Sequence, residues 1–172
     1  MKVYKTKLHG VNRLVLNNFE DHRGTYLELY DKKNHNEACN NTQFVQDDVS
    51  VSRKDVLRGL HGDDQTTKLV SVLNGSVYAV LADNRKDSPT YKQWEAFTLS
   101  KYNMNQLYVP AGIGNSMLAL EDNTIYHYKQ DTHFVDGRQF TIRWDDPEWN
   151  FHWPISNPIL SIRDINGKYT EE

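Results

Sequence analysis

Short apolar or alternating runs separated by turn residues dominate this chain, whereas helical periods are few. The apolar run at residues 69–73 is followed by Asn74-Gly75 and then by the mostly apolar residues 76–81. An Asn-Gly pair between two such runs favours a type I′ turn, which needs positive φ at both central positions. The pattern therefore predicts a β-hairpin. Further strands are predicted over residues 25–30, 94–99, 106–109, 117–120, 124–129 and 140–144.

The close spacing of these short strands predicts an all-β fold, built as an antiparallel sandwich or barrel with few short helices. The chain has 172 residues, which fits one domain, and no internal repeat, low-complexity tract or Gly/Ser linker divides it. We therefore expect a single domain over residues 1–172.

Composition excludes several classes of protein. The 10 Tyr, 6 Phe and 4 Trp residues supply large side chains for burial, which argues against a disordered chain. No apolar run approaches the ~18 residues of a membrane span, and the first residues lack the apolar core of a secretory signal. A formal net charge of -3 argues against nucleic acid as a partner. The single cysteine, Cys39, cannot form an intrachain disulfide, so a cytoplasmic location is expected.

The most unusual segment combines Arg58, His61 and, further on, Lys68. Side chains alternate between the two faces of a strand, so Arg58 and His61, three positions apart, would point to opposite faces of a straight strand. They share a face only if Gly59 bends or bulges the strand. Spacing alone favours an ordinary strand end with solvated charges over a functional cluster.

Two further segments carry candidate chemistry. Alternation places Tyr126 and Tyr128 on one face of a strand and His127 on the other. A tyrosine inside a barrel is more often packing than a general acid, and both interpretations stay open. Asp164 either caps a surface turn or orients a histidine from across the fold, and spacing does not decide between these roles.

Metal binding is not expected. Small β-barrels often hold metals through two histidines two positions apart, but His61 is followed by Gly62 and Asp63. The other histidines are scattered singly, and a lone histidine is more often structural than a ligand. The sequence therefore predicts neither a metal nor a cofactor.

An ordered set of short motifs runs through most of the chain. Its members are residues 21–24 with Glu28, residues 44–47 with Ser50 and Ser52, residues 57–61, residues 68–70, Asp83 with Arg85 and residues 88–89, Pro110 with Gly112, residues 128–129, residues 144–147, residues 153–154, and Ser161 with Asp164. Each motif is weak by itself, but the ordered set resembles the dTDP-4-dehydrorhamnose 3,5-epimerase family, a metal-free branch of the cupin superfamily. The resemblance implies a cupin jelly-roll barrel and an isomerase that acts on a nucleotide-linked sugar.

The resemblance also implies catalytic roles. The histidine of the family's Arg-Gly-Leu-His motif removes a proton beside the sugar ketone, and this role falls on His61, with Asp164 as its paired carboxylate. Lys68 would stabilise the enolate oxygen at C4, and Tyr128 would return a proton from the opposite face. The chemistry needs these residue types, because a proton beside a ketone is weakly acidic and inversion requires a donor opposite the base.

Binding residues and partners follow from the same resemblance. Arg23 and Arg58 match residues that grip the diphosphate, and Glu28, Gln46 and Arg163 match positions near the nucleotide or the sugar. The family forms homodimers in which an N-terminal strand joins the partner's sheet and the residue matching Arg23 reaches the neighbouring site. We therefore expect a homodimer with a nucleotide-sugar substrate, and neither a nucleic acid nor a membrane as a partner.

The chain departs from the family pattern at three places. Asn115 stands at the position of a second active-site histidine, where it can hydrogen-bond a sugar hydroxyl but cannot act as a base. Phe134 replaces a frequent second tyrosine, and the connection from His61 to Lys68 is short. Asn115 and the short connection resemble the branch that acts on GDP-6-deoxy-4-keto-heptoses in bacterial capsule synthesis. Such a sugar is therefore the preferred substrate, epimerised at C3, C5 or both.

Three alternatives remain open. The first is a dTDP-4-keto-6-deoxyhexose 3,5-epimerase, and the second is a 3,4-ketoisomerase of the same fold. The third is a cupin that binds a sugar nucleotide without catalysis. Loss of the second histidine favours the third alternative, whereas the presence of His61, Lys68, Tyr128 and Asp164 favours an enzyme, because a binding protein has no need of an acid–base set.

Overall fold

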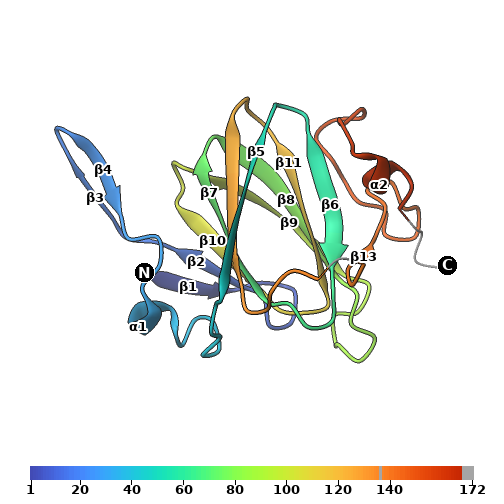
Figure 1. Cartoon of the computed structure of the whole chain (residues 1–172), viewed down its shortest axis with the longest axis horizontal. Helices are drawn as coiled ribbons and strands as arrows, with labels where there is room; N and C mark the ends of the chain where they lie inside the picture. The colour runs from blue at the N-terminus through green and yellow to red at the C-terminus, as the bar shows by residue number, and fades with distance from the viewer. Residues whose placement is uncertain (136, 168–172) are drawn as a thin grey trace.

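The computed structural model describes residues 1–135 and 137–167, and its regular elements are almost all antiparallel strands (Figure 1). A six-stranded sheet contains, in spatial order, β1 (Lys2–Lys5), β2 (Asn12–Val15), β10 (Asn105–Val109), β7 (Lys68–Asn74), β12 (Thr124–Gln130) and β5 (Gln46–Ser52). A five-stranded sheet contains β13 (Phe140–Thr141), β6 (Leu57–Gly62), β11 (Ile113–Ala119), β8 (Ser76–Asp83) and β9 (Trp94–Ser100). The expected all-β class is confirmed.

The remaining elements lie outside these two sheets. A separate hairpin of β3 (Asn18–Asp21) and β4 (Gly24–Leu27) projects from the body, at the left of Figure 1. Two helices of four residues each, α1 (Lys32–His35) and α2 (Ile162–Ile165), complete the described part of the chain. Neither of these helices has the length or apolar character to cross a membrane.

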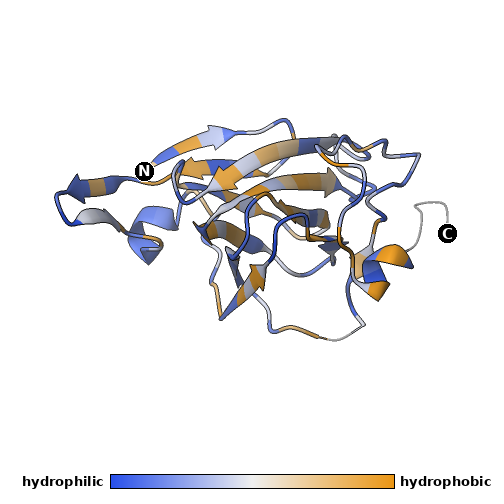
Figure 2. Ribbon diagram, turned by 90° about the horizontal axis from the view of Figure 1, so that it is seen from above, coloured by the Kyte–Doolittle hydropathy of each residue, from blue (hydrophilic) through white to orange (hydrophobic). Residues whose placement is uncertain are grey.

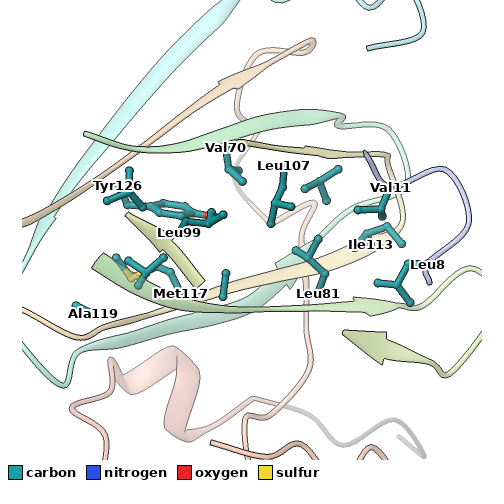
Figure 3. Close-up of a cluster of buried hydrophobic side chains, with 14 residues drawn as sticks. Leu8, Val11, Val70, Leu81, Leu99, Leu107, Ile113, Met117, Ala119 and Tyr126 are labelled. Atoms are coloured by element: carbon teal, nitrogen blue, oxygen red, sulfur yellow. The ribbon is translucent and has the colours of Figure 1, made fainter. Parts of the chain in front are cut away.

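The two large sheets enclose the main core. Apolar and polar residues form alternating bands along the strands (Figure 2), which is the pattern of sheets with one buried face. Side chains from both sheets meet between the layers (Figure 3), among them Val70 and Leu107 from the six-stranded sheet and Leu81 and Met117 from the five-stranded sheet. Burial of this apolar surface is the main force that holds the sheets together.

The predicted Asn74-Gly75 hairpin is wrong, although strands lie on both sides of it. β7 pairs with β10 and β12, whereas β8 pairs with β11 and β9, so the chain crosses from one sheet to the other at Gly75. Gly75 has φ +73°, but Asn74 is not among the described residues with positive φ, and a type I′ turn needs both. A Cβ on Gly75 would lie 2.5 Å from Thr124 Oγ1, so the corner requires glycine.

Other predicted boundaries differ in detail. β11 begins four residues before the predicted 117–120 strand, at Ile113, and the predicted 25–30 and 140–144 strands end early, at Leu27 and Thr141. Strands β1 and β3 have entirely exposed residues. Such strands carry no apolar alternation, and alternation is the signal on which strand prediction rests.

Candidate active site

A bulge in β6 brings Arg58 and His61 to the same place. In the pairing of β6 with β11, His61 lies opposite Asn115 and Arg58 lies opposite Met117, so β6 has one more residue than β11 between the two pairs. Gly59 lies inside this bulge with φ +114°, and a Cβ there would be 2.6 Å from the Asn115 carbonyl oxygen. The sequence made a shared face conditional on a bend at Gly59, and that condition is met.

The two side chains line a cavity of about 250 Å³. This volume is below the ~300–1,000 Å³ of pockets that enclose a whole drug-sized ligand, so the cavity suits one sugar ring, with the rest of a nucleotide sugar outside it. The lining residues come from both large sheets and from the C-terminal segment: Ser50, Arg58, His61, Lys68, Asn115, Met117, Tyr126, Tyr128, Gln139, Ser161 and Asp164.

His61 and Asp164 form a hydrogen-bonded pair across 103 residues of sequence. His61 Nε2 lies 2.6 Å from Asp164 Oδ1, and Ser161 Oγ donates to the other carboxylate oxygen at 2.7 Å. Burial by itself raises the pKa of Asp164, but the hydrogen bonds from His61 and Ser161 outweigh it and hold the pKa below its usual value. An ionised Asp164 keeps the His61 proton on Nε2, which leaves Nδ1 as the nitrogen that accepts a proton.

Asp164 is held in place by α2. Ser161 caps this helix, because its hydroxyl accepts a hydrogen bond from the Asp164 backbone N–H at 3.1 Å. The Asp164 side chain is buried, with 2% of its surface exposed. Of the two roles that spacing left open, the structure shows contact with a histidine from across the fold.

Lys68, at the start of β7, supplies a buried positive charge to the cavity. Its Nζ lies 4.9 Å from the centre of the Tyr128 ring. Burial lowers the pKa of Lys68, and the more distant charges of Asp63 and Asp48 act in the opposite direction. Within the described chain no ion pair neutralises this ammonium group, so it can interact with a developing negative charge on a ligand.

Tyr126 and Tyr128 both line the cavity from β12, as strand alternation predicts. Burial raises the pKa of Tyr128, so its hydroxyl stays protonated and can act as a donor. Tyr128 belongs to the six-stranded sheet and His61 to the five-stranded sheet. The His61 imidazole and a protonated Tyr128 hydroxyl therefore enter the cavity from opposite walls.

Asn115 also lines the cavity, next to His61 on the adjacent strand. Its side-chain oxygen accepts a hydrogen bond of 3.1 Å from the Tyr126 hydroxyl. The sequence identified Asn115 through the family pattern, whereas the partnership with Tyr126 was not predicted.

Two predicted binding residues lie away from this cavity, on the projecting hairpin and just after it. Arg23 forms an exposed ion pair with Asp21 at 2.6 Å, and Glu28 accepts a hydrogen bond from Asn34 at 3.1 Å. Each lines a different surface hollow near the hairpin. Within one chain, the structure does not bring them together with His61.

Gln46 and Arg163 do not line the cavity but contact residues near it. Gln46 donates to Asp48, which lies opposite Tyr128 in the pairing of β5 with β12. Arg163, on α2, donates to Gln139, which is itself a lining residue.

Sequence reasoning missed Met117 and Gln139 as lining residues. Met117 follows Asn115 by two positions on β11, so strand alternation could have found it. Gln139 lies in an irregular segment, where no periodicity provides a signal. In the described part of the chain, no three His, Cys, Asp or Glu side chains gather as a metal site, and the expectation of a metal-free protein stays a prediction.

The sequence of this chain is similar to the sequences of known enzymes. The sequence pattern of the family described as dTDP-4-dehydrorhamnose 3,5-epimerase matches residues 5–172. A dTDP-4-dehydrorhamnose 3,5-epimerase of Shigella flexneri is 37% identical over 172 residues, which cover 98% of this chain and 95% of that protein.

Solved structures give the same result. The dTDP-4-dehydrorhamnose 3,5-epimerase of Bacillus anthracis, with TDP and PPi bound, is 37% identical with a TM-score of 0.93, and the match covers 98% of each chain. A dTDP-6-deoxy-D-glucose-3,5-epimerase of Legionella pneumophila, in complex with dTDP-4-keto-L-rhamnose, is 32% identical with a TM-score of 0.92, over 98% of this chain and 92% of that one. The predicted cupin architecture is confirmed.

Proposed function

The chain belongs to the dTDP-4-dehydrorhamnose 3,5-epimerase family, and we propose that it inverts C3 and C5 of a dTDP-linked 4-keto-6-deoxyhexose. It is an epimerase of nucleotide-linked 4-keto-6-deoxy sugars by this membership. The observation that carries the proposal is the placement of His61 and Tyr128 on opposite walls of a cavity that also contains Lys68. Inversion of a carbon requires a base on one face and a proton donor on the other.

The proposed reaction begins at His61. Nδ1 of His61 takes the proton from a carbon beside the C4 ketone, and the electron pair of the broken C–H bond moves into the ring to give an enolate with its charge on the C4 oxygen. The Lys68 ammonium stabilises this oxygen, and the Asp164 carboxylate stabilises the imidazolium that forms. Tyr128 then gives its hydroxyl proton to the opposite face of the carbon and restores the ketone.

The Lys68 ammonium group can assist the inversion of both C3 and C5. C3 and C5 flank the same C4 carbonyl, so removal of a proton from either carbon places the negative charge on the same oxygen. Lys68 can therefore remain at this oxygen during both inversions, while the sugar changes which carbon it presents to His61. Between the two steps His61 loses its extra proton to solvent, and Tyr128 regains a proton from solvent.

The choice of nucleotide rests on the relatives. The two solved structures described above hold TDP or a dTDP-sugar, and the Shigella relative is named for a dTDP-sugar. The GDP-heptose substrate and the capsule pathway, which Asn115 and the short loop suggested, have no support among these proteins. We therefore favour the hexose, which the sequence had offered as an alternative.

Deuterium exchange tests the proposal. The protein is incubated in D2O with dTDP-4-keto-6-deoxyglucose and, separately, with a GDP-6-deoxy-4-keto-heptose, and NMR follows C3 and C5. Exchange and inversion at both carbons of the dTDP-sugar are expected. Exchange only with the heptose, or at C3 alone, would overturn the substrate or the double inversion. Transfer of the ketone to C3 would indicate a ketoisomerase, and binding without exchange would indicate a non-catalytic cupin.

We also propose a homodimer. Phe19 and Tyr26 lie opposite each other on the projecting hairpin with 66% and 70% of their surfaces exposed. Val49, Val51 and Leu73, on the six-stranded sheet, are exposed to 58%, 61% and 41%. Large apolar side chains with this exposure, on the hairpin and on one sheet, are candidates for burial in an interface. A second copy would cover them, and its hairpin would carry Arg23 to the neighbouring cavity.

Mixed dimers test this arrangement. Arg23→Ala and His61→Asn proteins are each expected to be weakly active or inactive. When unfolded together and refolded, they should form mixed dimers in which one site receives Arg23 from one chain and His61 from the other, so activity returns. If Arg23 served its own chain, no site in the mixture would be complete and activity would stay absent. Light scattering of the unmodified protein checks the dimer itself.

A further inference from the structure

A buried hydrogen bond joins the two sheets at the inner side of the cavity. Tyr126, on β12, is 3% exposed and belongs to the main core (Figure 3). Its hydroxyl donates to Asn115 Oδ1 across the barrel interior at 3.1 Å. Asn115, on β11, is 9% exposed and lies beside His61. Neither the proposed reaction nor the predicted binding set uses Tyr126.

This bond determines which end of the Asn115 amide is available to a ligand. Burial raises the pKa of Tyr126 far above its usual value, so the phenol keeps the proton that it donates in this hydrogen bond. In the structure this hydroxyl faces the amide oxygen, which turns the NH2 group to the other side. Among the described residues this NH2 group has no partner, and the side chain that carries it lines the cavity.

We propose that Tyr126 is a positioning residue that holds the Asn115 amide with its NH2 group toward the cavity, where it donates a hydrogen bond to an oxygen of the keto sugar. This inference rests on the proposed function, because the acceptor is an oxygen of that substrate. Asn115 then presents a donor that does not titrate beside the base. A freely rotating amide would present its oxygen as often as its NH2 group, and an oxygen cannot bind a carbonyl.

The restraint that Tyr126 places on the Asn115 amide is testable without any substrate. In ¹⁵N-labelled protein, the side-chain amide signal of Asn115 is identified by its loss in Asn115→Ala. A rigid amide, with a high heteronuclear NOE, is expected in the unmodified protein, and a mobile one in Tyr126→Phe. An equally rigid amide in Tyr126→Phe would overturn the positioning role. This result stands even if the protein fails to turn over dTDP-4-keto-6-deoxyglucose, so failure of the inference and failure of the proposed function are distinguishable.

Kinetics test the consequence for catalysis. One neutral hydrogen bond corresponds to a loss of roughly 3- to 10-fold in kcat/KM, which is expected for both Tyr126→Phe and Asn115→Ala. Because Tyr126 acts through Asn115, the double variant should be no slower than Asn115→Ala alone. Equal losses from Tyr126→Phe in both backgrounds, or no loss in either, would refute the coupling.

Tyr108→Phe is the matched control. Tyr108 is also buried, at 4% exposed, and its hydroxyl is hydrogen-bonded to Thr42 at 3.0 Å, but it does not line the cavity. Both Tyr→Phe variants remove a buried hydroxyl and should lower the melting temperature to a similar extent. Only Tyr126→Phe should lower kcat/KM. A similar kinetic loss in Tyr108→Phe would show that general loosening of the barrel, and not the position of Asn115, controls the rate.

Discussion

Gly59 is the residue on which both the bulge and the site depend, so Gly59→Ala is the most informative substitution. A Cβ at this position would lie 2.6 Å from the Asn115 carbonyl oxygen and 2.8 Å from Ser116 Cα, and both of these are backbone atoms of β11. Neither can move without shifting the strand. The φ of +114° is also unfavourable for any residue other than glycine.

The expected loss of stability has two parts. An unfavourable positive φ costs about 1–2 kcal/mol, and overpacking against a strand costs about 1–3 kcal/mol more. Gly59→Ala should therefore lower the free energy of unfolding by about 2–5 kcal/mol. Because β11 carries Asn115 and β6 carries His61, relief of the clash also displaces His61, the proposed base. A displacement of about 1 Å lowers kcat/KM by about 100-fold.

Urea unfolding and steady-state kinetics measure the two effects. Gly24→Ala is the control, because Gly24 has φ +125° but a Cβ added there would meet nothing within 4 Å, so it carries the backbone cost without the clash. It should lose no more than about 2 kcal/mol. A Gly59→Ala protein with a free energy of unfolding no lower than that of Gly24→Ala, or with the activity of the unmodified enzyme, would refute this role of Gly59.

Four further substitutions test the proposed acid–base set. His61→Asn should abolish deuterium exchange while nucleotide affinity, measured by calorimetry, stays near its original value; retained activity would exclude His61 as the base. Tyr128→Phe should slow inversion more than exchange, and an unchanged ratio of the two rates would show that another group returns the proton. Burial lowers the pKa of Lys68 and raises that of Tyr128, so kcat/KM should decline at a pH below the usual lysine range as Lys68 loses its proton. In Lys68→Arg this alkaline decline should move to higher pH. A decline at an unchanged pH would show that another group causes it. The pKa of Asp164 is lowered in the folded chain, so its contribution to stability is complete above the unfolded value of about 3.9 and is lost as the pH falls through the folded value. Asp164→Asn should therefore flatten the acid side of a stability–pH curve and reduce kcat by about 100-fold, and an unaltered curve would contradict the pairing with His61.

Local pattern was sufficient for much of the fold. The apolar runs around Val70 and Val80 predicted β7 and β8, because a strand that buries apolar residues must repeat them along its length. Alternation placed Tyr126 and Tyr128 on one face for the same geometric reason. The exposed strands β1 and β3 were not predicted, since they bury no face and their pairing depends on neighbours distant in the sequence.

The candidate catalytic residues were proposed from ordered motifs, whereas their contacts were not predictable from spacing. His61 and Asp164 are 103 positions apart, and only the packing of α2 near β6 brings them to 2.6 Å. The hydrogen bond between Tyr126 and Asn115 likewise joins strands of different sheets. Gln139 lines the cavity from an irregular segment, where no periodic pattern predicts the direction of a side chain.

The sequence by itself determined the all-β class, several of the core strands and the faces of their side chains, and it made a shared face for Arg58 and His61 conditional on a bend at Gly59. Each of these follows from interactions among residues close in the chain, whose geometry is set by the backbone. Tertiary structure alone decided that Gly75 turns between sheets instead of closing a hairpin, and that His61 and Tyr128 line one cavity from different sheets. These outcomes depend on how two sheets pack, and that packing is set by the sum of many long-range apolar contacts that no local pattern contains.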